Sequence, residues 1–112
     1  MVVIHEVEKS KSLNTVNIID YVTNAVVIKT ILKKETGSIK AMAVDTGEGI
    51  AEKTIPFDSF IQIIDGEANI IISGHSYILN TGQSIVVPAH VANFVKPNRR
   101  FKMMVTTIKC GY

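Results

Sequence analysis

The stretches GIAEKTIPFDSFIQIIDG, residues 49–66, and GQSIVVPAHVAN, residues 82–93, decide the fold of this chain. Each combines a run of apolar and β-branched residues with glycine and proline at its ends, a pattern typical of short strands bounded by turns. Pro56 and Pro88 fall between the apolar runs, where a missing backbone N–H removes no bond from a sheet. The centre of the chain is therefore predicted to be β-structure.

The same pattern extends over most of the chain. Strands are predicted at residues 25–34, 38–45, 60–65, 67–73, 76–79, 84–87, 91–96 and 100–108. Asp65 and Gly66, between two of these runs, predict a hairpin because glycine tolerates a positive φ. Turn signals recur about every 8–12 residues, which favours a sandwich or barrel over alternating strands and helices. Residues 10–24 fit either one short helical turn or an edge strand.

Length and charge narrow the possible partners. The chain has 112 residues and a formal net charge of +2, which suits one compact domain with no nucleic-acid partner. Cys110 is the only cysteine, so an internal disulfide is excluded and a reduced compartment is the simplest prediction. No apolar stretch approaches the roughly 20 residues of a membrane helix, and no signal-peptide pattern is evident. We expect a cytoplasmic protein with no membrane partner.

Residues 47–96 resemble the small single-domain cupins of the cupin 2 conserved-barrel type. The features that carry the resemblance are a glycine-rich bend, Pro56 with Phe57, the turn at 65–67, Gly82, and Pro88 with Ala89. The resemblance implies an all-β, double-stranded β-helix (jelly-roll) cupin barrel, which is commonly dimeric in this family. We assign the barrel to residues 25–112 and an N-terminal arm, available to a dimer interface, to residues 1–24.

The resemblance also locates the positions where cupins carry metal ligands. The first cupin motif has two histidines one residue apart and then an acid, and Ser59 stands at the acid position. With the shorter family spacing the histidine positions are Lys53 and Ile55, and with the longer spacing they are Glu52 and Thr54. A protonated lysine repels a cation, isoleucine offers no lone pair, and serine is a weak neutral donor.

In the second cupin motif, the resemblance places Asn93 at the histidine position and His90 at the usual glycine. The expected ligands are therefore absent from both motifs. A rearranged site of His90 with Glu48 or Glu52 finds no support in the ligand spacing. We predict no metal and no cofactor.

Strand alternation selects the side chains that would face the inside of the barrel. The predicted ligand-binding residues are Gln62, Asn93, Met42 and Met104 in the cavity, with Lys53 and His90 near its mouth. The amides would bind a ligand or pair with neighbouring polar groups, and the methionines would line a pocket or fill the core. Lys53 is expected to point to solvent, although burial would lower its pKa and make it a base. His90 is expected in a surface loop, yet its ordinary pKa suits proton transfer.

These residues favour a metal-free cupin barrel that binds a small molecule or serves as an accessory module. One alternative is a metal-independent isomerase or lyase, with Lys53 or His90 as base and Asn93 holding a polarised oxygen. Another is a structural or interaction protein whose barrel is filled with side chains. The faces of 25–34 and 38–45 are apolar with few charges, so we expect a partner to cover them in a homodimer.

Overall fold

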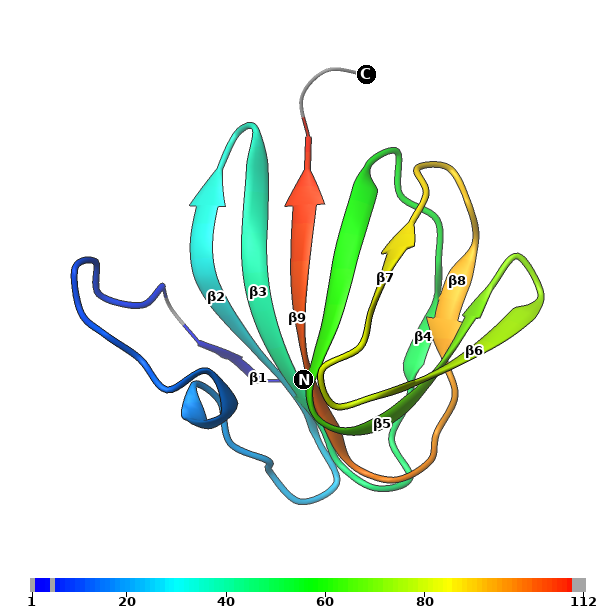
Figure 1. The fold of residues 1–112 in the computed structure, drawn as a ribbon, viewed down its shortest axis with the longest axis horizontal. Helices are drawn as coiled ribbons and strands as arrows, with labels where there is room; N and C mark the ends of the chain where they lie inside the picture. The colour runs from blue at the N-terminus through cyan, green and yellow to red at the C-terminus, as the bar shows by residue number, and fades with distance from the viewer. Residues whose placement is uncertain (1, 5, 110–112) are drawn as a thin grey trace.

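The computed structural model describes residues 2–4 and 6–109, with side chains from Glu6 onward. Cys110, on which the expected compartment rests, lies outside the described residues, as does His5. The described residues are almost entirely strands (Figure 1). In chain order the strands are β1 (Val2–Ile4), β2 (Val26–Lys34), β3 (Gly37–Val44), β4 (Ile50–Lys53), β5 (Asp58–Ile72), β6 (His75–Asn80), β7 (Ser84–Val87), β8 (Asn93–Val95) and β9 (Phe101–Ile108).

A single 3-10 turn, η1 (Thr15–Asn17), lies within the segment that fitted either a helical turn or an edge strand. It is only three residues long, and no helix in the described part of the chain has the length and apolar character to cross a membrane. The all-β prediction is confirmed. Strands β1 and β4 were not predicted, and β4 lies in the bend that precedes Pro56.

The strands form one curled sheet in the order β1-β2-β3-β9-β5-β8-β4, with β6 and β7 each paired to β5. The pair β1 and β2 is parallel, and the other pairs are antiparallel. Figure 1 shows β2, β3 and β9 on one side of the curl, and β4, β6 and β8 on the other. β5 links the two sides, and its path therefore sets the shape of the barrel.

β5 runs as one strand of 15 residues through the position of the predicted hairpin. Gly66 has a φ of +85°, as a turn would need, but the strand bends there without reversing. A Cβ at Gly66 would lie 2.5 Å from the carbonyl oxygen of Arg100 and 3.1 Å from the Cα of Phe101. The pairing of β5 with β9 also shifts between Ile63 and Asp65. The hairpin prediction is wrong because the glycine serves a bend and a close approach of β9.

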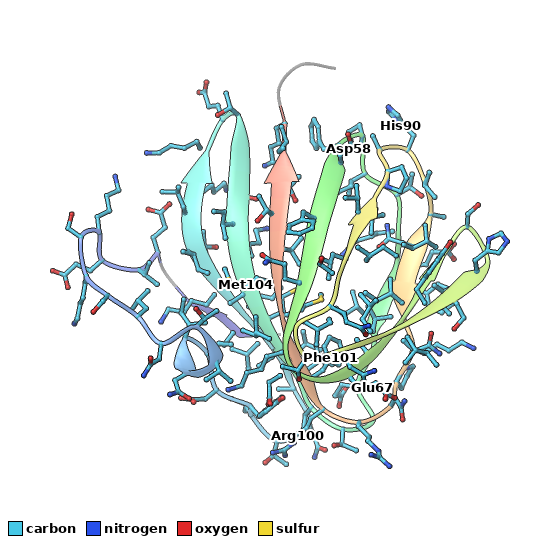
Figure 2. All side chains as sticks on the ribbon, viewed as in Figure 1. Asp58, Glu67, His90, Arg100, Phe101 and Met104 are labelled. Carbon is cyan, nitrogen blue, oxygen red and sulfur yellow. The ribbon has the colours of Figure 1, made fainter. Side chains whose placement is uncertain are left out.

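The main core lies on the inner face of the sheet. Its most completely buried side chains include Val44, Ile63, Phe101 and Met103, each no more than 1% exposed. These residues come from β3, β5 and β9, and Figure 2 shows Phe101 near the end of the barrel where these strands converge. Apolar side chains therefore fill the inner face of the sheet around Phe101.

The N-terminal arm packs on the outer face of the same sheet. Ile19, 3% exposed, joins a second apolar cluster with Val27, Ala41 and Ala43. The partly buried Ile18, Tyr21 and Ile31 pack against this cluster. The outer face of β2 and β3, which led us to expect a partner subunit, is therefore covered at these positions by the arm of the same chain.

Polar contacts fix the arm as well. The Nζ of Lys102 donates to the carbonyl oxygen of Val16 at 2.8 Å, and the Nζ of Lys29 donates to that of Ile18 at 3.2 Å. The hydroxyl of Tyr21 donates to the carboxylate of Asp65 at 2.7 Å. The arm is thus held by side chains of β2, β5 and β9 as well as by apolar burial.

Candidate functional site: a lysine-lined cavity in the barrel

A cavity of about 230 Å³ lies inside the barrel, with walls from β2, β3, β4, β5, β7, β8 and β9. Its apolar lining residues are Ile28, Met42, Ile55, Ile61, Val87, Val95, Met103 and Val105. Its polar lining residues are Lys40, Lys53, Ser59, Asn93 and Thr107. Among the described residues, no aspartate or glutamate lines this cavity. The cavity is therefore apolar with cationic and neutral polar groups.

The alternation of β3 places Lys40 and Met42 on the cavity wall. Met42 stands opposite Ile28 of β2 and Met103 of β9, which makes an apolar wall across three strands. Lys40 stands opposite Val105 two pairs further along. Met42 thus faces the cavity as the alternation predicted, and its neighbour on the same face is a lysine.

A bulge in β4 brings Lys53 to the cavity. Ile50 pairs with Val95 and Lys53 pairs with Asn93, so β4 contains one more residue than β8 between these two pairs. Ile50 packs on the core and Lys53 lines the cavity, although strict alternation would place them on opposite faces. The residue as a whole remains exposed to solvent, as expected, but its side chain lies at the cavity mouth.

The protein lowers the pKa of Lys53. The largest cause is desolvation, because part of the side chain lies against apolar walls. The second cause is the positive charge of Lys40, which disfavours another ammonium nearby. Solvent exposure limits the effect, so the ammonium form is disfavoured without being excluded.

Neutral polar groups complete the lining. Ser59 and Thr107 are cross-strand neighbours whose hydroxyl oxygens lie 3.1 Å apart, within hydrogen-bonding distance. Asn93 is buried, and its Nδ2 donates to the carbonyl oxygens of Lys53 at 3.4 Å and Val91 at 3.3 Å. Both Asn93 bonds are long, so the amide is weakly held and its orientation leaves room for a stronger partner.

Gln62 and Met104 do not line the cavity, and the inward orientation predicted for them is wrong. Along β5 the inward residues include Ile61 and Ile63, which leaves Gln62 exposed on the outer face. On β9 the cavity residue is Met103, one position before Met104. The alternating pattern was read in the wrong phase on both strands, and a one-residue error reverses every side chain.

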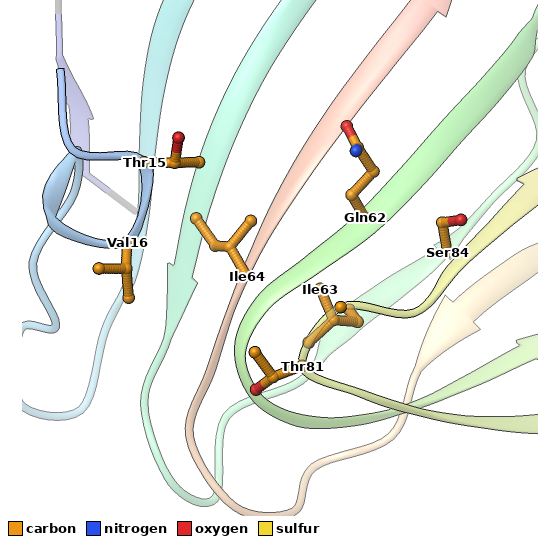
Figure 3. Close-up of a pocket in the computed structure, with 8 residues that line it drawn as sticks. Thr15, Val16, Gln62, Ile63, Ile64, Thr81 and Ser84 are labelled. Atoms are coloured by element: carbon orange, nitrogen blue, oxygen red, sulfur yellow. The ribbon is translucent and has the colours of Figure 1, made fainter. Parts of the chain in front are cut away.

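Gln62 instead lines a surface depression of about 310 Å³ between η1 and β5. Figure 3 shows it with Thr15 and Val16 of the arm on one side and Ser84 on the other. This depression is larger than the inner cavity but more open to solvent, and its described lining contains no ionisable group. It offers a ligand less enclosure and less electrostatic attraction than the barrel interior.

His90 lies outside the cavity as well. It is exposed in the loop between β7 and β8, and Figure 2 shows its ring directed away from the barrel. Its backbone N–H donates to the carbonyl oxygen of Ile55 at 2.7 Å, and its φ is +65°. The expected surface-loop position is observed, and the side chain is not placed to act on a molecule in the barrel.

Lys40 and Thr107 are lining residues that we did not single out from the sequence. A signal for Lys40 was present, because it lies two residues from Met42 on a strand predicted to alternate. Thr107 lay at the end of the final predicted strand, where nothing distinguished its two faces.

Several solved structures have a similar fold. A conserved protein of unknown function from Streptococcus pyogenes matches with a TM-score of 0.88 and 24% identity, over 100% of this chain and 98% of its own. A cupin superfamily protein from Desulfitobacterium hafniense matches with a TM-score of 0.85 and 23% identity, over 92% and 94% of the two chains. This protein has the fold of a small cupin-type domain. The predicted jelly-roll fold is thereby confirmed.

Another similar structure is a cupin 2 conserved barrel domain protein from Leptotrichia buccalis, with a TM-score of 0.83 and 26% identity. The match covers 87% of this chain but 47% of that protein, so the cupin domain spans about half of its length. No protein-family model matches the sequence, and no curated protein matches it.

The cavity lies at the positions that the resemblance to cupins assigns to metal ligands. The four positions given by the shorter motif spacing all line it: Lys53, Ile55, Ser59 and Asn93. Glu52, which the longer spacing would use, lines a separate groove. The shorter spacing is therefore the one that this cupin domain follows.

Those four side chains do not fit a transition metal. Such an ion needs three or four convergent nitrogen, oxygen or sulfur donors at about 2 Å, and this set provides one ammonium, one hydrocarbon, one hydroxyl and one amide. Across residues 2–4 and 6–109, no group of three or more histidine, cysteine, aspartate and glutamate side chains gathers to offer another site. The donor set is suited to holding an uncharged or negatively charged molecule.

Proposed function

We propose that this cupin domain binds a small molecule inside the barrel without the help of a metal. The observation that carries the proposal is the cavity inside the barrel, where polar side chains interrupt otherwise apolar walls. Such a combination is typical of ligand sites, because apolar contact supplies affinity and a few polar groups fix orientation. A barrel that served only as a scaffold would gain stability by filling this space.

A matched pair of variants tests the site. Val105 lines the cavity, and Thr106 follows it on the opposite face of β9. A thermal-shift screen of sugars, small acids and other metabolites should find compounds that raise the Tm of the native domain by mass action. Val105→Phe should abolish those shifts because the ring occupies the cavity, whereas Thr106→Phe should retain them.

If both variants lose the Tm shifts, or if both keep them, the compounds do not bind in the cavity. A screen with no stabilising compound would favour the structural alternative over a binding domain.

A second candidate function is a metal-independent isomerase or lyase that uses Lys53 as its base. The observation in its favour is that the pKa of Lys53 is lowered by desolvation and by Lys40, while Asn93 stands opposite it. Incubating each stabilising compound with the domain and following it by NMR separates the two functions. Conversion that Lys53→Gln abolishes supports the enzyme, and recovery of every compound unchanged supports binding alone.

Metal content gives an independent test. Elemental analysis of the purified, dialysed domain should find far less than one transition-metal ion per chain, because the lining offers no adequate donor set. Removal of trace metal with a chelator should leave the Tm and the thermal shifts unchanged. One tightly held iron, zinc, nickel or manganese ion per chain would refute the metal-free function.

A homodimer remains part of the proposal. The arm covers the outer face of β2 and β3 around Ile19, but exposed apolar side chains remain elsewhere, including Phe60 and Val86, which pair across β5 and β7. Light scattering at micromolar concentration should give twice the chain mass of 12.3 kDa. A mass of one chain would show that the arm alone closes the sheet.

A further inference from the structure

We propose that the ligand of this cavity is a small carboxylate with an apolar body, whose charge is held by Lys40 and Lys53. The inference rests on the proposed binding function and names the chemical class of the ligand. Lys40 from β3 and Lys53 from β4 line one cavity, although 13 positions separate them in the sequence. The fold, and not a local motif, brings the two cations together.

The two ammonium groups have no counter-ion among the residues that the structure describes. Neither forms an ion pair with a described residue, and no described carboxylate lines the cavity with them. Cations near apolar walls are disfavoured unless they are paired. The lowered pKa of Lys53 has this origin, in desolvation and in the charge of Lys40. A bound anion would relieve both penalties at once.

Neutral donors are placed to help. The hydroxyls of Ser59 and Thr107 share one hydrogen bond, which uses one of their two protons and leaves the other to donate to a ligand. The Nδ2 of Asn93 makes only long bonds to backbone oxygens and can turn to a stronger acceptor. These groups are matched to the oxygens of an anion.

The rest of the lining limits what else the anion can be. Eight of the 13 lining residues are apolar, so a phosphate or a polyacid would leave several oxygens against hydrocarbon. The volume of about 230 Å³ lies below the roughly 300–1,000 Å³ of pockets for drug-sized ligands. A monocarboxylate with a short branched or ring-shaped hydrocarbon body satisfies both limits.

Methionine methyl groups report directly on this site. Met42 and Met103 line the cavity, while Met104, the residue after Met103 on β9, does not line it and serves as an internal control. The domain labelled with ¹³C-methyl methionine is titrated with pairs of equal shape: 3-methylbutanoate and 3-methylbutanamide, cyclopentanecarboxylate and its amide, and phenylacetate and phenylacetamide. We expect the acids to shift the Met42 and Met103 resonances and to bind at least tenfold more tightly than their amides.

Charge-removing variants complete the experiment. Lys40→Gln and Lys53→Gln should each weaken carboxylate binding about tenfold while leaving binding of the amides nearly unchanged. Lys96→Gln removes the same charge from an exposed position outside the cavity and should leave both affinities unaltered. The methyl spectrum of each variant also shows whether the fold is retained.

The outcomes separate this inference from the proposed function. If acids and amides bind equally, or if stabilising compounds from the thermal-shift screen are neutral and no acid binds, the carboxylate inference fails and ligand binding stands. Carboxylate binding that survives both lysine variants, or that shifts Met104 as strongly as Met42, also overturns it. Failure of every compound in both experiments overturns the proposed function itself.

Discussion

Lysines lie on both faces of the same curled sheet, and their polar contacts differ between the two faces. On the outer face, Lys29 and Lys102 donate to backbone oxygens of the arm. At the inner cavity, Lys40 and Lys53 form no ion pair with a described residue. The ammonium groups of the outer pair therefore already stabilise the fold through hydrogen bonds to the arm. The ammonium groups of the inner pair can still bind a ligand.

The ammonium group of Lys102 is in contact with both a backbone oxygen and an aromatic ring. The residue is only 7% exposed, and its Nζ lies 5.0 Å from the centre of the Tyr21 ring. Desolvation and the hydrogen bond to Asp65 raise the pKa of Tyr21, which keeps its hydroxyl a donor at physiological pH. The charge of Lys102 is thus stabilised by a carbonyl dipole and an aromatic face. In the described part of the chain, no comparable partner contacts the ammonium group of Lys53.

The first test of this contrast weakens the packing of the arm on the outer face. Ile19→Ala removes a side chain that is 3% exposed and should lower the free energy of unfolding by about 2–5 kcal/mol, measured by urea denaturation. Leu13→Ala, at a 45% exposed position of the same arm, should change it by less than about 0.5 kcal/mol. Equal small effects of the two variants would mean that the arm does not contribute to the outer face in solution.

The second test removes the buried outer lysine. Lys102→Met keeps the aliphatic stem but deprives the carbonyl oxygen of Val16 of its charged donor. A hydrogen bond of this kind contributes about 1.5 kcal/mol, so we expect a loss of that order in the same urea experiment. A variant as stable as the parent would show that water replaces the ammonium without loss, and that the outer lysine is not structural.

The smallest effect, with the opposite sign, is expected at the inner face. The pKa of Lys53 is lowered, so the folded state carries a penalty while the ammonium is protonated, and the penalty disappears as pH rises from the folded-state pKa toward the unfolded-state pKa. Lys53→Met should therefore stabilise the domain at neutral pH and lose that advantage in the alkaline range. Because the residue remains exposed, the gain should stay below about 1 kcal/mol.

Denaturation of the parent and of Lys53→Met across neutral and alkaline pH checks this sign. A loss of stability similar to that of Lys102→Met would show that Lys53 has a structural partner, and the contrast between the two faces would disappear.

Much of the fold could be predicted because glycine, proline and β-branched runs act locally. The strands around Met42 and Asn93 were identified, and both side chains line the cavity as alternation predicted. The inward face of β5 could not be predicted because both of its faces are apolar: Phe60 and Ile64 alternate with Ile61 and Ile63. With no polar face to mark the outside, the phase of Gln62 was not determined by the residues themselves.

The sequence by itself determined an all-β domain whose cupin motifs lack metal donors, since residue identity decides which atoms can coordinate an ion. The tertiary structure decided which groups replace them. A bulge in β4 turns Lys53 to the cavity, and the closing of the sheet brings Lys40 into the same lining. Gly66 bends β5 because β9 passes close to it, and the sequence does not show such an approach between distant strands.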